Sequence, residues 1–103
     1  MAHIPANVER GAALLDERLG PDWDEQIDLN RLDLSSNCNC IVGQLNPAGQ
    51  RLRHKRYWQG IEELNAQASP ERLGFNLWGR QTWDALTAGW VALILGRRRR
   101  RRG

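Results

Sequence analysis

The pattern in this sequence that most resembles a chemical site is Cys38-x-Cys40, two thiols separated by one residue. A structural zinc site normally takes four ligands, and this pair supplies two of them. His3, His54 and Asp33 are the remaining candidates, with no second spaced pair. Dithiol redox centres usually have two residues between their cysteines, and one residue would close a strained ring. We therefore interpret the cysteines as small, partly buried thiols near a helix start, with redox chemistry and metal binding as alternatives. The sequence predicts no cofactor.

Hydrolysis or acyl transfer would need a nucleophile, a base and an orienting acid, and only two histidines could serve as the base. His3 lies close to the start of the chain. His54 lies among cations, where like charge favours its neutral form and no acid is adjacent. The paired acids fall on predicted exposed faces; they are Asp16/Glu17, Asp22/Asp24 and Glu62/Glu63. The glycines are scattered singly and form no phosphate loop. We expect that the protein is not an enzyme.

Clustered positive charge is the stronger functional signal. One cluster combines cations with an aromatic ring, the ingredients of phosphate contact and base stacking. It consists of Arg51, Arg53, Lys55, Arg56 and Trp58. The second is a run of six adjacent cations that repel one another, Arg97, Arg98, Arg99, Arg100, Arg101 and Arg102. Both clusters are predicted to bind polyanions, whereas Tyr57 fits the apolar stripe of its own predicted helix and is assigned to the core.

The arginine run has three interpretations. It could be a solubilising tail, a binding segment for nucleic acid or another polyanion, or a contact with an anionic membrane surface. In the last case Trp83, Trp90 and Leu93 would supply the apolar contact. The seam that these residues form with Leu86 is nevertheless assigned to the core, with a docking face for a partner as the alternative.

The charge is unevenly distributed between the two halves of the chain. Residues 1–50 hold eight acids and three arginines, a net charge of −5, whereas residues 51–103 hold twelve bases and four acids, a net charge of +8. The sum is the formal net charge of +3, and the arginine run supplies six of the fifteen bases. Without that run the chain would be acidic, so the charge bears on partners rather than on the fold.

With 103 residues, the chain has room for one small domain. Residues 1–10 contain Pro5 and charged residues rather than an apolar segment, so we expect no export signal and a cytoplasmic protein with reduced thiols. The stretch 85–96 is weakly polar but shorter than the roughly 20 residues that a membrane-spanning helix needs.

The spacing of apolar residues predicts helices over residues 8–19, 37–45 and 55–67, and a last helix from residue 81 to 96. Residues 21–27 are predicted to form one or two short turns, and residues 27–34 an extended or turn-like connector. Phe75, Leu77 and Trp78 are expected to fold into the core from a loop over 75–79. The predicted fold is all-α, a small irregular bundle of about four to five helices with a flexible, arginine-rich C-terminal tail. The domain would span residues 1–96 and the basic tail residues 97–103.

Several motifs together resemble a known group. They are Leu14-Leu15-Asp16-Glu17, Ile27-Asp28-Leu29, Leu32-Asp33-Leu34-Ser35-Ser36, Cys38-Asn39-Cys40, Ile41-Val42-Gly43-Gln44-Leu45 and Gly74-Phe75. The chain from about residue 11 to 96 is similar to small uncharacterised helical proteins of actinobacteria and their bacteriophages. The resemblance implies a small cytosolic helical protein and no activity for any residue. The basic stretch 51–56 and the terminal arginines depart from it.

The leading hypothesis is a non-enzymatic accessory or regulatory protein of phage or actinobacterial type that binds a macromolecular partner. In this hypothesis the acidic first half presents a surface to a protein partner, and the arginine tail adds attraction for a polyanion. The alternative is a small nucleic-acid-binding protein that uses the basic stretch 51–56 and Arg97–Arg102. An anionic membrane surface is the third candidate partner.

Overall fold

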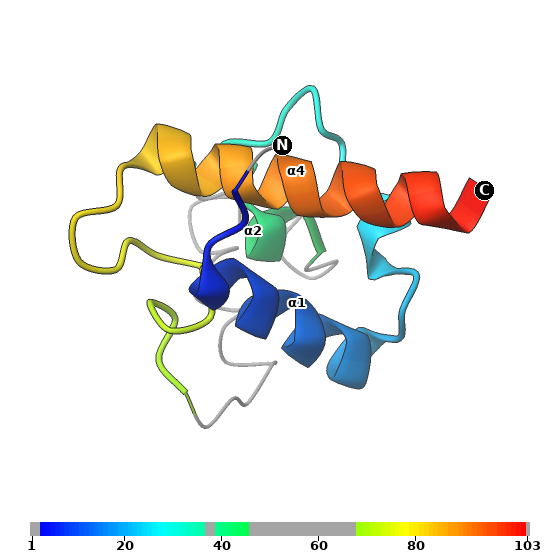
Figure 1. Cartoon of the computed structure of the whole chain (residues 1–103), viewed down its shortest axis with the longest axis horizontal. Helices are drawn as coiled ribbons and strands as arrows, with labels where there is room; N and C mark the ends of the chain where they lie inside the picture. Colours follow the sequence, from blue (N-terminus) through cyan, green and yellow to red (C-terminus); the bar gives the residue numbers. More distant parts are fainter. Residues whose placement is uncertain (1–2, 37–38, 46–67, 103) are drawn as a thin grey trace.

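Two helices form the frame of the molecule, α1 (Ala6–Leu19) and the longer α4 (Trp83–Arg102), which lies across it (Figure 1). The computed structural model describes residues 3–36, 39–45 and 68–102. Between α1 and α4 along the chain come η1 (Trp23–Gln26), a short 3₁₀ helix, and α2 (Ile41–Leu45). No strand occurs in the described ranges, and the chain is a compact all-α globule, as the sequence predicts.

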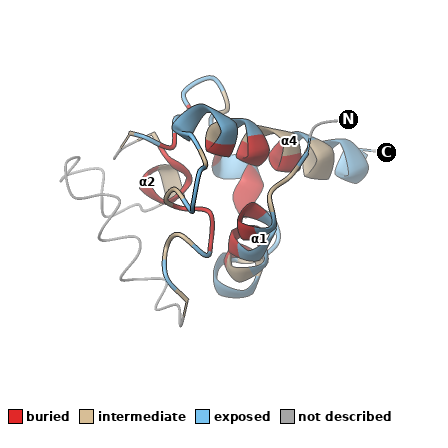
Figure 2. Cartoon of the chain, turned by 60° about the vertical axis from the view of Figure 1, so that its left-hand side comes forward, coloured by how far each residue is buried: buried red, intermediate tan, exposed pale blue. Residues whose placement is uncertain are grey.

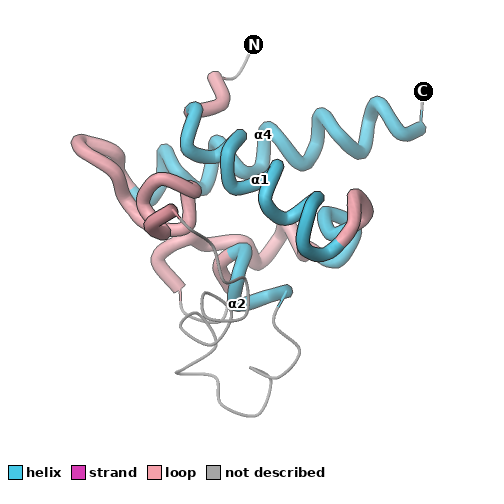
Figure 3. The backbone as a smooth tube through the Cα atoms, turned by 90° about the horizontal axis from the view of Figure 1, so that it is seen from below, coloured by secondary structure: helices cyan, strands magenta, loops and turns pink. Residues whose placement is uncertain are grey.

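The short elements fill the space beside this frame. Both long helices run from left to right in Figure 1, and η1 lies between their C-terminal ends, where it contacts both. The helix α2 also contacts η1 and lies to one side of α1 and α4, as Figure 3 shows. The acidic residues Asp24 and Glu25 of η1 therefore lie beside the C-terminal end of α4.

Most predicted elements are present where the structure describes them. The helix predicted at 8–19 is α1, and η1 lies within the predicted turns at 21–27. The helix predicted at 37–45 begins only at Ile41, because the Ser36 hydroxyl and the Asp33 carboxylate accept hydrogen bonds from the backbone and hold a turn ahead of it. The helix predicted at 55–67 lies outside the described residues.

The core forms where the facing sides of α1 and α4 meet the loops, as the buried residues in Figure 2 show. Its centre is the fully buried indole of Trp90, which stacks on Phe75 at 5.7 Å between ring centroids and meets Trp23 edge-on at 6.0 Å. The Trp90 Nε1 donates a 2.6 Å hydrogen bond to the carbonyl of Gly74. The prediction that Trp90, Leu86, Leu93 and Ile94 are core residues is confirmed.

Close backbone contacts require glycine at the crossings. A Cβ on Gly11 would lie 1.9 Å from the carbonyl oxygen of Leu73, and one on Gly89 would lie 2.8 Å from the Pro5 ring. Gly74 has a positive φ of 72° and packs against the Val8 backbone. These contacts fix the loop 70–75 and the start of α4 against α1.

Two of the expected core tryptophans are exposed, Trp78 by 42% and Trp83 by 37%, so those predictions are wrong. Trp83 is the first residue of α4, whereas the close approach of the α1 side of the molecule to α4 is at Gly89, which packs against Pro5 and Val8. Trp78 retains 42% of its surface accessible, because the turn through Gly79, with φ 67°, carries it outward while Phe75 fills the core.

The prediction of a flexible tail beginning at residue 97 is also wrong for Arg97–Arg102. The helix α4 passes through Gly96 without interruption and ends at Arg102. Six adjacent cations repel one another and would disfavour this helix if all were solvated. Three of them, Arg97, Arg98 and Arg101, are instead paired with acids and carbonyl groups beside α4.

Candidate functional site

The structure divides the predicted polyanion-binding residues into three groups. The first cluster, Arg51, Arg53, Lys55, Arg56 and Trp58, lies outside the described residues. Within the arginine run, Arg97, Arg98 and Arg101 point into the molecule, and we call them the inner arginines. Arg99, Arg100 and Arg102 are the outer arginines.

Two of the inner arginines, Arg97 and Arg101, contact the carboxylate of Asp24, whose side chain is completely buried in η1. Arg97 Nε donates to Asp24 Oδ2 at 2.6 Å, and Arg101 donates to both oxygens at 2.8 and 2.9 Å. Arg97 also holds Asp16 on α1 through two hydrogen bonds of 2.6 and 3.1 Å, and Arg101 reaches Glu25. Acids from α1 and η1 are thereby linked to the end of α4.

The protonation states in this cluster follow from the pairing. Burial raises the pKa of Asp24, but hydrogen bonds from Arg101 and Arg97 outweigh it and hold the pKa below its ordinary value. Asp16 behaves likewise: burial raises its pKa, and the hydrogen bonds from Arg97 and Trp23 lower it further than burial raises it. The hydrogen bond to Asp16 raises the pKa of Arg97, and the one to Asp24 raises the pKa of Arg101. All these groups stay charged at neutral pH.

Backbone and aromatic groups complete the surroundings of the inner arginines. Arg98 donates to the carbonyl oxygens of Asp24 and Ile27 at 2.6 and 2.7 Å, and its Nε is buried without a hydrogen-bond partner among the described residues. The Arg97 guanidinium also lies over the Trp23 ring at 5.2 Å, while Trp23 Nε1 donates to Asp16. Arg97 and Arg98 are thus partly buried structural groups. Arg101 is paired in the same cluster but keeps 40% of its side-chain surface, and it lines an open hollow of about 340 Å³ with Pro21, Arg97 and Arg100.

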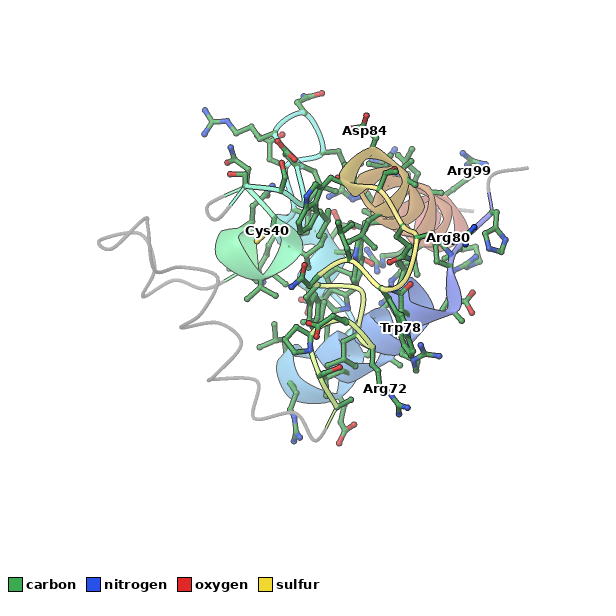
Figure 4. All side chains as sticks on the ribbon, turned by 90° about the vertical axis from the view of Figure 1, so that its left-hand side faces the viewer. Cys40, Arg72, Trp78, Arg80, Asp84 and Arg99 are labelled. Carbon is green, nitrogen blue, oxygen red and sulfur yellow. The ribbon has the colours of Figure 1, made fainter. Side chains whose placement is uncertain are left out.

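The outer arginines have the opposite surroundings. All three are exposed or lie at the exposed end of α4, and none forms a hydrogen bond or ion pair with a residue that the structure describes. Arg99 is labelled in Figure 4, where it projects away from the helix. These three side chains are available to bind phosphate groups.

Helical phase explains this division and is a signal that the sequence already contains. Leu86, Trp90 and Ile94 are spaced by four, and Arg97 and Arg101 continue the same stripe at steps of three and four. A residue on this stripe faces the core, so the last two turns of the buried face consist of arginine. The partners are the acids of residues 16–25, which lie far away in the sequence.

A second cationic surface was missed because Trp78 was assigned to the core. The guanidinium groups of Arg10 and Arg72 lie over its ring, at 5.1 and 5.6 Å from the centroid. Arg10 Nε donates to the carbonyl oxygen of Arg72 at 2.9 Å, which links α1 to the loop. In Figure 4, Arg72, Trp78 and Arg80 lie on one side of the molecule, on the loop that precedes α4. We call Arg10, Arg72, Trp78 and Arg80 the tryptophan surface.

The cysteine pair is only half described. Cys40 is buried, and its Sγ accepts a 3.2 Å hydrogen bond from the backbone N–H of Gly43 in α2; Cys38 lies outside the described residues. This position agrees with a small buried thiol near a helix start. Among residues 3–36, 39–45 and 68–102, no group of three potential metal ligands occurs, and none of the helices could span a membrane.

Comparisons with protein-family models, with curated proteins and with solved structures find no match for this chain. The resemblance of residues 11–96 to the actinobacterial and phage proteins therefore stays a prediction.

Proposed function

We propose that this protein is a non-enzymatic accessory protein that binds nucleic acid, with the outer arginines contacting phosphates. The observation that carries the proposal is that three cations, Arg99, Arg100 and Arg102, are exposed at the end of α4 with no carboxylate partner among the described residues. Solvated guanidinium groups attract phosphates and release counterions when they bind them.

The charge distribution favours nucleic acid over a partner that would read the acidic first half of the chain. Asp16, Asp24 and Glu25 would be central to such an acidic surface, but each is paired with an arginine of α4. The charge that these acids could present to a protein partner is therefore largely neutralised. The outer arginines keep their full charge.

The number of available cations sets the expected salt dependence. For single strands, the slope of log affinity against log salt is roughly −0.7 for each phosphate neutralised. Three outer arginines therefore predict a contribution of about −2 to the slope of log affinity against log salt, whereas six solvated arginines would give about −4.

The test is a titration of a fluorescent single-stranded oligonucleotide at several salt concentrations between about 50 and 200 mM. The variant Arg99→Gln/Arg100→Gln/Arg102→Gln should bind more weakly and lose a slope of about 2. Arg31→Gln is the control, because Arg31 is exposed but already paired with Asp28. An unchanged slope in the triple variant, or a wild-type chain that binds no nucleic acid, would contradict the proposal.

A further inference from the structure

We propose that the tryptophan surface is a stacking site for an unpaired base, so that the nucleic acid bound is single-stranded. This inference rests on the proposed function, because the outer arginines supply the attraction for phosphates. The site adds what those arginines lack, an aromatic face that is fixed in place and accessible to solvent.

The backbone that carries Trp78 is held in position by hydrogen bonds. The Trp78 backbone N–H donates to Gln81 Oε1 at 3.0 Å. Gln81 in turn exchanges two 3.0 Å hydrogen bonds with the buried amide of Asn7 in α1. Together with the Arg10 hydrogen bond to the Arg72 carbonyl, these contacts tie the loop to α1 on both sides of Trp78. The loop therefore needs little ordering when a ligand binds.

The guanidinium groups of Arg10 and Arg72 cover part of the ring, but Trp78 stays exposed. It keeps 42% of its surface accessible and lies beside an open hollow of about 280 Å³, which is lined by Trp78, Arg10, His3 and Gln81 among others. A flat aromatic ligand has room to approach from this hollow. Base–aromatic stacking of this kind is tolerant of sequence, because each base presents a π-face.

The cations around the ring fit the backbone of the same ligand. Arg10, Arg72 and Arg80 form no ion pair with a carboxylate in the described part of the chain. The loop that carries Arg72 and Arg80 lies at the N-terminal end of α4, whereas the outer arginines lie at its C-terminal end (Figure 1), so a strand that contacts both must run along the length of α4. Glu9 and Glu71 directly precede two of these cations in the sequence and reduce the local positive charge. Stacking must therefore supply much of the affinity at this site.

A double helix does not present the face of an unpaired base to such a ring. In a double helix the bases are stacked on each other and their faces are inaccessible from the grooves. A single strand can turn a base outward onto an aromatic side chain, with phosphates on either side contacting arginine. The geometry thus selects single strands over duplexes.

The experiment uses the full chain and two fluorescent probes with the same number of phosphates, an oligothymidylate of about 12 nucleotides and an abasic strand of the same length. The wild-type chain should bind the oligothymidylate about tenfold more tightly than the abasic strand. Trp78→Ala should bind both probes equally, and Trp78→Phe should restore most of the difference.

Trp83→Ala is the matched control, because Trp83 is also exposed and no arginine of the described residues lies over its ring. It should keep the tenfold preference, and all three variants should unfold at nearly the wild-type temperature. Equal binding of the two probes by the wild-type chain would overturn the stacking site, while a salt slope that still depends on the outer arginines would leave the proposed function standing. Tighter binding to anionic vesicles than to either strand, lost in Trp78→Ala, would also overturn it in favour of a membrane contact.

Discussion

The inner and outer arginines are the same residue type in one uninterrupted run, yet only the inner arginines are paired with acids or backbone carbonyl groups of the described residues. The inner set surrounds a buried carboxylate and backbone carbonyl groups of η1, and Arg97 retains only 16% of its side-chain surface. The outer set is directed to solvent at the end of the same helix. Composition and net charge treat the six residues as one feature, but helical phase separates them into a structural group and a binding group.

The inner arginines also show how positive charge can be placed beside a small core. Burying a single unpaired charge is costly, but here guanidinium groups meet Asp24, Asp16 and carbonyl oxygens with short hydrogen bonds. Removing one partner from such a cluster leaves the others uncompensated, which typically costs about 3–5 kcal/mol. The end of α4 is therefore expected to be part of the cooperative fold.

The largest expected effect is that of truncation. A chain ending at Gly96 leaves Asp24 buried without its partners, so its Tm should fall by more than about 15 °C in a thermal melt followed by circular dichroism. A chain ending at Arg101 loses only the outward-facing Arg102 and Gly103 and should melt close to the wild-type temperature. Equal melting temperatures for both truncated chains would contradict the structural role of the inner set.

Two tryptophans of α4, Trp90 and Trp83, show a similar contrast between a buried and an exposed position. Trp90→Ala removes the fully buried centre of the core and should lower the free energy of unfolding by about 3–5 kcal/mol. Trp83→Ala, seven residues earlier, removes a side chain that is 37% exposed and should cost less, about 1 kcal/mol. Denaturant unfolding of both variants measures the difference. Comparable losses would mean that Trp83 is packed after all.

Acid should weaken the ion pairs that the inner arginines form with Asp16 and Asp24. The pKa values of Asp16 and Asp24 are lowered in the folded state, so they stabilise the protein above their unfolded value of about 3.9. That stabilisation is lost as the pH falls from about 4 through the folded pKa values, when the carboxylates take up protons. The free energy of unfolding should therefore decrease steeply below about pH 4.

Asp24→Asn provides the comparison for this pH dependence. It should be less stable at neutral pH and should lose less stability on acidification, because one titrating carboxylate is gone. Asp22→Asn removes an exposed acid two residues away and should keep the wild-type pH dependence. A pH profile identical in wild type and Asp24→Asn would show that the cluster is not the acid-sensitive element.

Local patterns were sufficient to predict much of this fold. The spacing of Val8, Ala12 and Leu15 predicts α1, and that of Leu86, Trp90 and Leu93 predicts the buried face of α4, because both depend only on helical periodicity. The all-α class follows from the same periodicity. Burial of Trp78 and Trp83 was wrong because their exposure is decided by where the start of α1 meets α4 and by a glycine turn, which are tertiary features.

The candidate site was harder to predict for a related reason. A run of arginines is usually solvated, and the acids that neutralise half of it lie more than 70 residues away in the sequence. Only the three-dimensional fold brings Asp24 beneath Arg97 and Arg101. The stripe that continues from Ile94 to these two arginines indicates which face is buried, but it does not identify the partner. The arginines over Trp78 depend on a contact between α1 and the loop that spans 62 residues of the sequence.

The most direct test of the account compares two variants with identical composition and charge. Arg97→Gln/Arg98→Gln/Arg101→Gln and Arg99→Gln/Arg100→Gln/Arg102→Gln each remove three positive charges from the same helix. Thermal unfolding of the two side by side should show that the inner triple lowers Tm by more than about 10 °C and the outer triple by less than about 3 °C. Equal melting temperatures, or a larger loss in the outer triple, would contradict the division of the run into a structural and a binding face.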